Sequence, residues 1–191
     1  MAMRGWVKVL VIMVLLPILI GGIALAFAGR SLAFQILQDR TAHKFPEVQW
    51  IGTGELARWL DDSTRPRPVV LDARTEAEFG VSHLKTAVQI DPYKPSLKSL
   101  AQVPKDTPLV VYSSAGYRGA RVASWLGKQG YGKARNLAGG VFLWVNQGRP
   151  IFREENRPAA LVHPYDRRWG LLVEKNYRAP AAEIVERSAA P

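Results

Sequence analysis

Cysteine is absent from all 191 residues of this sequence. The absence excludes disulfide bonds, thiolate metal ligands and every mechanism in which a cysteine is the nucleophile. It does not indicate a compartment, because cysteine-free chains occur in reducing and in oxidising surroundings. The three histidines, His43, His83 and His163, lie far apart and show no metal-ligand spacing. We therefore expect neither a metal nor another cofactor.

Charged residues are missing from the 21 positions between Val9 and Gly29. A helix of this length crosses a hydrocarbon core of roughly 30 Å, since each residue adds about 1.5 Å. We therefore expect residues 1–30 to form a single-pass transmembrane anchor. The small residues of Ala26–Ala28 leave a cleaved signal peptide as the alternative. The flanking basic residues define the orientation poorly and slightly favour a soluble domain on the non-cytoplasmic side.

Acidic residues are scarce in the middle of the chain. Residues 69–150 hold eleven Lys and Arg against five Asp and Glu, a surplus of six within a net charge of +10. Such a segment favours anionic partners, although solubility alone is the simpler explanation. The basic residues form no run and accompany no motif of stacking aromatics, so nucleic acid is not expected as a partner.

Short apolar runs alternate with amphipathic helical patterns from residue 48 to residue 151. We expect strands at residues 48–51, 69–71, 87–90, 109–112 and 134–137. We expect helices at residues 54–62, capped by Thr53, at 116–128 and at 141–145. The alternation predicts an α/β fold, a doubly wound parallel sheet with helices on both faces. Ligands bind such folds beyond the carboxyl ends of the strands, which points to the turn after Tyr112.

Two further segments flank this domain. Residues 31–47 are expected to be a linker, broken by Pro46, although Ser31–Leu37 has the pattern to continue or restart a helix. Residues 152–191 form a C-terminal extension with enough aromatic and apolar side chains to dock. The sequence leaves open whether the extension docks on its own domain or on a partner.

The turn between the fourth strand and its helix has the composition of an anion-binding loop. Its residues are Ser113, Ser114, Ala115, Gly116, Tyr117 and Arg118. Small residues let backbone N–H groups converge, and a helix start adds free donors and a partial positive charge. Arg118 can present a forked cation to the same anion. The alternative is an ordinary tight turn with Arg118 in solvent.

Three sequence motifs, which follow one another along the chain, resemble the rhodanese domain family. The first, LDARTEAEFGVSHLKTAVQI, contains Asp72, Arg74, Glu78 and His83, and the second is VVYSSAGYRGARVASWLGKQGY. The third, NLAGGVFLWVNQGRPI, matches the closing segment of the family. The resemblance extends from about Val48 to Ile151 and implies the rhodanese fold, with structural roles for the four residues of the first motif.

Ser113 stands where, by this resemblance, active relatives carry the cysteine that takes up sulfane sulfur. A serine hydroxyl reaches its anion only with an adjacent base and does not hold a transferable sulfur. The sequence therefore predicts a membrane-tethered pseudoenzyme, not a sulfurtransferase, which binds a small oxyanion or a protein partner. One alternative is a scaffold that presents residues 152–191 to a membrane complex. Another is an enzyme of altered chemistry in which a base, such as His83, activates Ser113.

Overall fold

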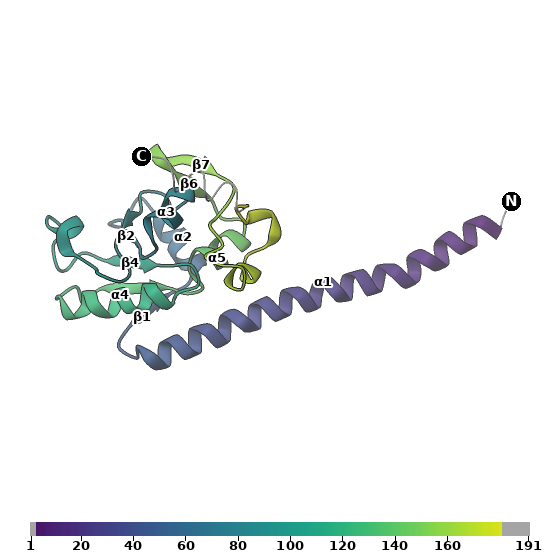
Figure 1. Ribbon diagram of the computed structural model, residues 1–191, viewed down its shortest axis with the longest axis horizontal. Coiled ribbons are helices and arrows are strands. Elements are labelled where there is room, and N and C mark those ends of the chain that lie inside the picture. The colour runs from purple at the N-terminus through teal and green to yellow at the C-terminus, as the bar shows by residue number, and fades with distance from the viewer. Residues whose placement is uncertain (1–2, 181–191) are drawn as a thin grey trace.

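A five-stranded parallel sheet organises the domain in the computed structural model, which describes residues 3–180 (Figure 1). The strands are β1 Gln49–Ile51, β2 Val69–Asp72, β3 Val88–Gln89, β4 Leu109–Tyr112 and β5 Ala134–Leu137. Their spatial order is β1-β5-β4-β2-β3, and every neighbouring pair is parallel. All five strands predicted from the apolar runs are confirmed, with small differences at their ends.

Helices cover both faces of this sheet, which confirms the predicted doubly wound α/β fold. Because side chains alternate along a strand, Val70 and Val110 face one way and pack with α2 (Thr53–Asp61) and α5 (Gly140–Asn146). Leu71 and Val111 face the other way and pack with α4 (Tyr117–Lys128). The turn after β4 lies at the carboxyl end of that strand, where α4 begins and the start of α5 contacts the turn.

The start of α2 differs from the prediction. Its N-cap is Gly52, and Thr53 is the first helical residue. The Thr53 hydroxyl donates instead to Oε1 of Gln147 at 2.6 Å. The Thr53 side chain thus links the start of α2 to the end of α5 and does not cap its own helix. A capping rule considers only neighbouring residues, so it could not predict this contact.

Residues 31–44, predicted to be a linker, are the last part of a single helix, α1 (Met3–Lys44). No proline or glycine interrupts the chain between Arg30 and Phe45, and part of this stretch packs on the domain. Phe34 and Thr41 are 6% and 5% exposed, and Arg30 pairs with Glu174 at 3.6 Å. Burial of one face therefore extends the helix beyond the expected boundary. Figure 1 shows α1 leaving the domain as one long rod.

The predicted transmembrane span at residues 9–29 falls within α1, and most of its side chains lie outside the described part of the structure. Among the residues that are described, no helix has both the length and the apolar character needed to cross a membrane.

The C-terminal extension folds back onto the domain. It comprises an antiparallel hairpin, β6 (Ile151–Arg153) and β7 (Arg157–Ala159), and the 3-10 helices η2 (Glu154–Asn156), η3 (Trp169–Leu172) and η4 (Lys175–Tyr177). Asn146 of α5 donates to the Leu172 carbonyl at 2.7 Å and accepts from the Glu174 N–H at 2.9 Å. Val162 and Val173 are fully buried. Up to residue 180, the extension is thus part of the domain.

A buried polar network ties β2 to β4. Arg74 pairs with Asp72 at 2.7 Å, and both side chains are fully buried. The Tyr112 hydroxyl donates to Asp72 at 2.5 Å and accepts from the Leu84 N–H at 3.0 Å. Burial and the Asp72 carboxylate raise the pKa of Tyr112, so its hydroxyl stays protonated. These contacts fix the strand ends from which the turn after Tyr112 begins.

Glu78 clamps the short helix α3 (Glu76–Val81) to α4. At the start of α3 it forms a capping box with Thr75, whose N–H donates to Oε2 at 3.0 Å. The same carboxylate accepts two bonds from the Arg118 guanidinium, at 2.6 and 2.7 Å. Burial by itself would raise the pKa of Glu78, but Arg118, helped by Arg74, lowers it to about 2. Glu78 is therefore ionised throughout the working pH range.

We expect this pair to produce a defined acid sensitivity. A carboxyl whose pKa falls from an ordinary 4.5 to about 2 on folding stabilises the fold above its unfolded pKa and loses that contribution as the pH drops. The loss is about 3 kcal/mol between roughly pH 5 and pH 2. Urea unfolding at fixed pH should show wild type losing this much more stability than Glu78→Gln over that window. Glu55→Gln, at a half-exposed surface pair, should follow wild type. Parallel curves for wild type and Glu78→Gln would contradict the pairing.

Candidate functional site

The turn after β4 is built around a glycine in a left-handed conformation. Gly116, the N-cap of α4, has φ of 109°, a value that residues with a Cβ rarely adopt. Its N–H donates to Oγ of Ser113 at 3.2 Å. The first turn of α4 then leaves backbone N–H groups without intrahelical acceptors. The loop therefore leads into a helix start with free backbone donors, and the predicted anion binding stays a prediction.

The start of α5 holds the other side of this loop. The N–H groups of Val141 and Phe142 donate to the carbonyl oxygens of Ser113 and Ser114 at 2.9 and 3.0 Å. The approach is so close that a Cβ on Gly140 would lie 2.1 Å from the Ser113 oxygen. Both carbonyl dipoles are thus satisfied by α5, and they do not oppose an anion on the far side of the loop.

Arg118 is placed differently from the expectation that it would fork onto a ligand anion. Both ends of its guanidinium bind Glu78, and Nη2 also donates to Oγ of Ser114 at 2.8 Å. The Ser114 hydroxyl in turn donates to Glu78 at 2.9 Å. Arg118 is 9% exposed, so its charge is largely balanced inside the protein. The sequence could not show this, because Glu78 precedes it by 40 positions.

Ser113 is 1% exposed, and no general base bonds its hydroxyl within the described part of the chain. Within residues 3–180, the hydrogen bond to its hydroxyl is the one from the Gly116 N–H. The His83 ring is occupied elsewhere: Nδ1 donates to the Leu84 carbonyl at 2.9 Å, and the ring stacks on Phe79 at 4.2 Å. Glu78 reaches Ser114, but a carboxyl of such low pKa is a weak base. The arrangement does not activate a serine nucleophile.

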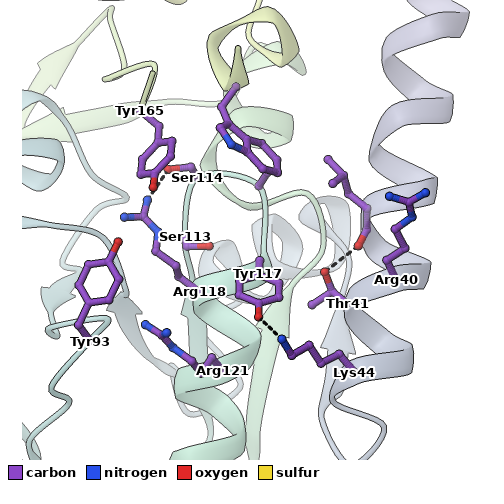
Figure 2. A pocket seen from close by; sticks show the side chains of 13 residues that line it. Arg40, Thr41, Lys44, Tyr93, Ser113, Ser114, Tyr117, Arg118, Arg121 and Tyr165 are labelled. Atoms are coloured by element: carbon purple, nitrogen blue, oxygen red, sulfur yellow. Dashed lines mark hydrogen bonds between the residues drawn. The ribbon is translucent and has the colours of Figure 1, made fainter. Parts of the chain in front are cut away.

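A pocket of about 510 Å³ opens above Ser113 (Figure 2). Its lining comes from α1, the segment after β3, the loop with α4, and the C-terminal extension. The lining residues are Leu37, Arg40, Thr41, Lys44, Tyr93, Ser113, Ser114, Ala115, Tyr117, Arg118, Arg121, Tyr165 and Trp169. Four of them are basic, and none of the lining residues described is acidic. One of the four, Arg118, is paired with Glu78, so three basic side chains remain to give the lining a positive charge.

The basic residues of this pocket differ in how far they are engaged. Lys44 donates to the Tyr117 hydroxyl at 2.7 Å. Arg121 donates to the Pro92 carbonyl and lies over the Tyr93 ring. The Arg40 side chain is exposed, and it makes no hydrogen bond or ion pair with the described part of the chain. Arg40 and Lys44 form no ion pair within residues 3–180, whereas Arg121 lies near enough to Asp91 to lower the pKa of that carboxyl.

Sequence analysis missed most of these wall residues. Arg40 and Lys44 fell in the expected linker, beyond the stretch Ser31–Leu37 in which a helical pattern was noted. Leu37, Arg40, Thr41 and Lys44 follow each other at i, i+3, i+4 and i+7, which places them on one helix face. That spacing was the available signal. No local signal brings Tyr165 and Trp169 to the loop, since they come from the far end of the chain.

His163 lies close enough to the loop to respond to the charges of Glu78 and Arg118. Burial lowers its pKa from the ordinary 6.5. Its Nδ1 accepts from the Tyr165 N–H at 2.9 Å, so the neutral ring carries its proton on Nε2. His163 therefore supports the backbone of Tyr165 and adds no positive charge near neutral pH.

Comparison with known proteins places this architecture in a family. Residues 53–147 match the Rhodanese-like domain. A sulfurtransferase of Allochromatium vinosum is 32% identical over 87 residues, covering 46% of this chain and 80% of that protein. The tRNA uridine(34) hydroxylase of an Enterobacter species is 24% identical over 148 residues, covering 73% of this chain but only 40% of that enzyme.

Solved structures agree on the fold. The solution structure of a rhodanese-like domain from Anabaena has a TM-score of 0.50 at 19% identity, covering 60% of this chain and 87% of that domain. Such low identity bears on the fold alone. The similarity to most of a sulfurtransferase, the matched domain and the parallel sheet lead to one conclusion: the chain belongs to the rhodanese-like domain family.

Proposed function

We propose that this chain is a rhodanese-like protein without sulfurtransferase activity that binds an anionic group in the pocket above Ser113. The observation that supports this proposal is the charge of the lining: four basic side chains and, among the described residues, no carboxylate. Arg118 is balanced by Glu78, so Arg40, Lys44 and Arg121 supply the attraction. Cations that line a concave surface with low-dielectric walls concentrate anions there.

Loss of the thiol is the second element of the proposal. Persulfide chemistry needs a thiolate, and the chain has no cysteine at any position. Ser113 occupies the matching position with its hydroxyl bound by a backbone N–H and with no base beside it. The loop framework, in contrast, is kept, because Gly116 and the start of α5 hold its backbone. Binding without turnover fits this combination.

The anionic group belongs either to a small molecule or to an acidic side chain of a partner protein. Both present oxygen atoms with negative charge, which Lys and Arg bind through charge-assisted hydrogen bonds. Nucleic acid is not proposed, since the chain lacks a basic run with stacking aromatics.

We also propose that α1 anchors the protein to a membrane with the domain on the non-cytoplasmic side. The support is the uncharged stretch from residue 9 to residue 29 and its exposed apolar side chains, among them Leu15 at 58% and Leu16 at 50%. Exposed leucines at this density are costly in water and are stabilised by lipid. Because α1 continues into the wall of the pocket, the anchor would hold the pocket close to the membrane.

Anion binding is tested by calorimetric titration of the chain with sulfate and with thiosulfate. We expect binding that weakens as sodium chloride is added. Lys44→Gln should weaken it about tenfold, the effect of one lost charge-assisted hydrogen bond. Lys98→Gln makes the same change at an exposed position outside the pocket and should leave affinity unchanged. Absence of binding, or equal losses in both variants, would refute the proposed site.

The missing thiol is tested by a thiosulfate-to-cyanide sulfur transfer assay. We expect no activity above background for wild type and measurable activity for Ser113→Cys, because the loop and nearby cations favour a thiolate. Ser114→Cys is the matched control. It adds a thiol one residue away, where the side chain faces Glu78 and Arg118, and it should remain inactive. Sulfur transfer by wild type would overturn the proposal, and a folded but inactive Ser113→Cys would show that the loop has lost its shape.

Membrane anchoring is tested by alkaline extraction of membranes from cells that express the full chain. We expect wild type to stay in the membrane pellet at its full mass, which also excludes cleavage after Ala28. Replacing both Leu15 and Leu16 with Arg should release the protein, since each arginine near a span centre costs about 2.5–3.5 kcal/mol. Leu32→Arg alters an exposed leucine beyond the span and should not. Release of wild type itself would rule out the anchor.

A further inference from the structure

The geometry points to an organic anion with a flat aromatic body, and not a bare inorganic oxyanion, as the ligand of the pocket above Ser113. This inference rests on the proposed anion binding and names the class of ligand. Its first support is size. The cavity measures about 510 Å³, whereas a water molecule takes up about 30 Å³ of liquid. An inorganic oxyanion of a few atoms would leave most of the cavity empty, and cavities of roughly 300–1,000 Å³ suit larger organic ligands.

The second support is the aromatic lining. Tyr93, Tyr117 and Tyr165 are 58%, 41% and 40% exposed, and Trp169 and Leu37 join them around the same cavity. Exposed aromatic side chains gathered at one concave site are typical of ligand pockets. Rings of this kind bind the faces or edges of another ring, and each such pair contributes beyond simple burial. The faces of the rings, unlike the tyrosine hydroxyls, offer nothing to a small hydrated oxyanion.

The third support is how charge and rings are distributed. Figure 2 shows Arg40, Thr41 and Lys44 on α1 at one side and Tyr93 with Arg121 at the other, with the loop between them. Arg118 is occupied by Glu78, and the Tyr165 ring covers its guanidinium at 4.7 Å. The available cations thus lie at the walls, where they can meet an acidic group while the body of the ligand rests against the rings.

The conformation of Tyr165 adds a fourth observation. Its φ is 67°, in the left-handed region that bulky residues avoid. The conformation is held by the bond from its N–H to His163 at 2.9 Å. Backbone strain of this kind persists only where the surroundings impose it. Here it places an aromatic ring beside the loop that carries Ser113.

Six of the thirteen lining residues lie outside the family domain, which matches residues 53–147. Leu37, Arg40, Thr41 and Lys44 precede the domain, and Tyr165 and Trp169 follow it. The floor is therefore common to the family fold, while the chain's own flanking segments make the pocket large, aromatic and cationic. Ligand choice should depend on those segments.

The experiment compares two ligands with the same anionic group, methanesulfonate and benzenesulfonate, by calorimetric titration of the full chain. Benzyl alcohol serves as the neutral aromatic probe. We expect benzenesulfonate to bind at least about tenfold more tightly than methanesulfonate, the effect of burying one ring. Benzyl alcohol should not bind in the same concentration range, since the cations provide the anchor.

Trp169→Leu should lower the ratio of the benzenesulfonate affinity to the methanesulfonate affinity, because it removes one ring from the lining. Leu171→Ala is the matched control, because Leu171 lies in the same 3-10 helix, is 64% exposed and does not line the pocket. It should keep the ratio. If Trp169→Leu fails to fold, Tyr93→Leu, at a more exposed position, should reduce the ratio in the same way.

Three outcomes would count against the inference. Equal affinities for the two sulfonates would overturn it and leave the proposed anion binding intact. Tight binding of benzyl alcohol, or a ratio lowered equally by Leu171→Ala, would indicate nonspecific apolar adsorption. Binding of neither sulfonate, nor of sulfate or thiosulfate, would overturn the proposed function together with the inference.

Discussion

The ion pair between Glu78 and Arg118 is the interaction on which the candidate site depends. Its two bonds of 2.6 and 2.7 Å join α3 to the first turn of α4, and Ser114 completes the cluster. Breaking such a pair leaves an uncompensated buried charge, which is strongly destabilising. The pair also removes the loop's own cation from the surface. The proposed attraction for anions therefore depends on basic side chains elsewhere in the lining, on α1 and at Arg121.

The domain and its flanking segments each contribute residues to the pocket. The sheet, Gly116 and the start of α5 shape the floor, because they set the backbone around Ser113. The end of α1 and the C-terminal extension supply six of the thirteen lining residues. This arrangement argues against the extension as a freely presented scaffold, since its described part is packed onto the domain through Asn146 and buried valines.

Sulfur transfer and the proposed anion binding depend on different parts of the loop. Sulfur transfer depends on a single atom, because a hydroxyl does not replace a thiolate. Anion attraction depends instead on the backbone of the loop and on side chains that surround it. Serine at position 113 removes the first property, and the second is the basis of the proposed anion binding. A pocket with basic side chains above an unreactive hydroxyl is therefore consistent with a binding function that does not require catalysis.

The sequence by itself determined the α/β class, all five strands, both helix-covered faces and the absence of cysteine chemistry. It did so because strand and helix periods and glycine positions are local properties of the chain. Only the tertiary structure decided that Glu78 occupies Arg118, that residues 31–44 are helix instead of linker, and that Tyr165 and Trp169 reach the loop. These outcomes join residues tens of positions apart or depend on burying a helix face. A local sequence pattern cannot predict such contacts, because they form only when segments distant in the sequence pack against each other.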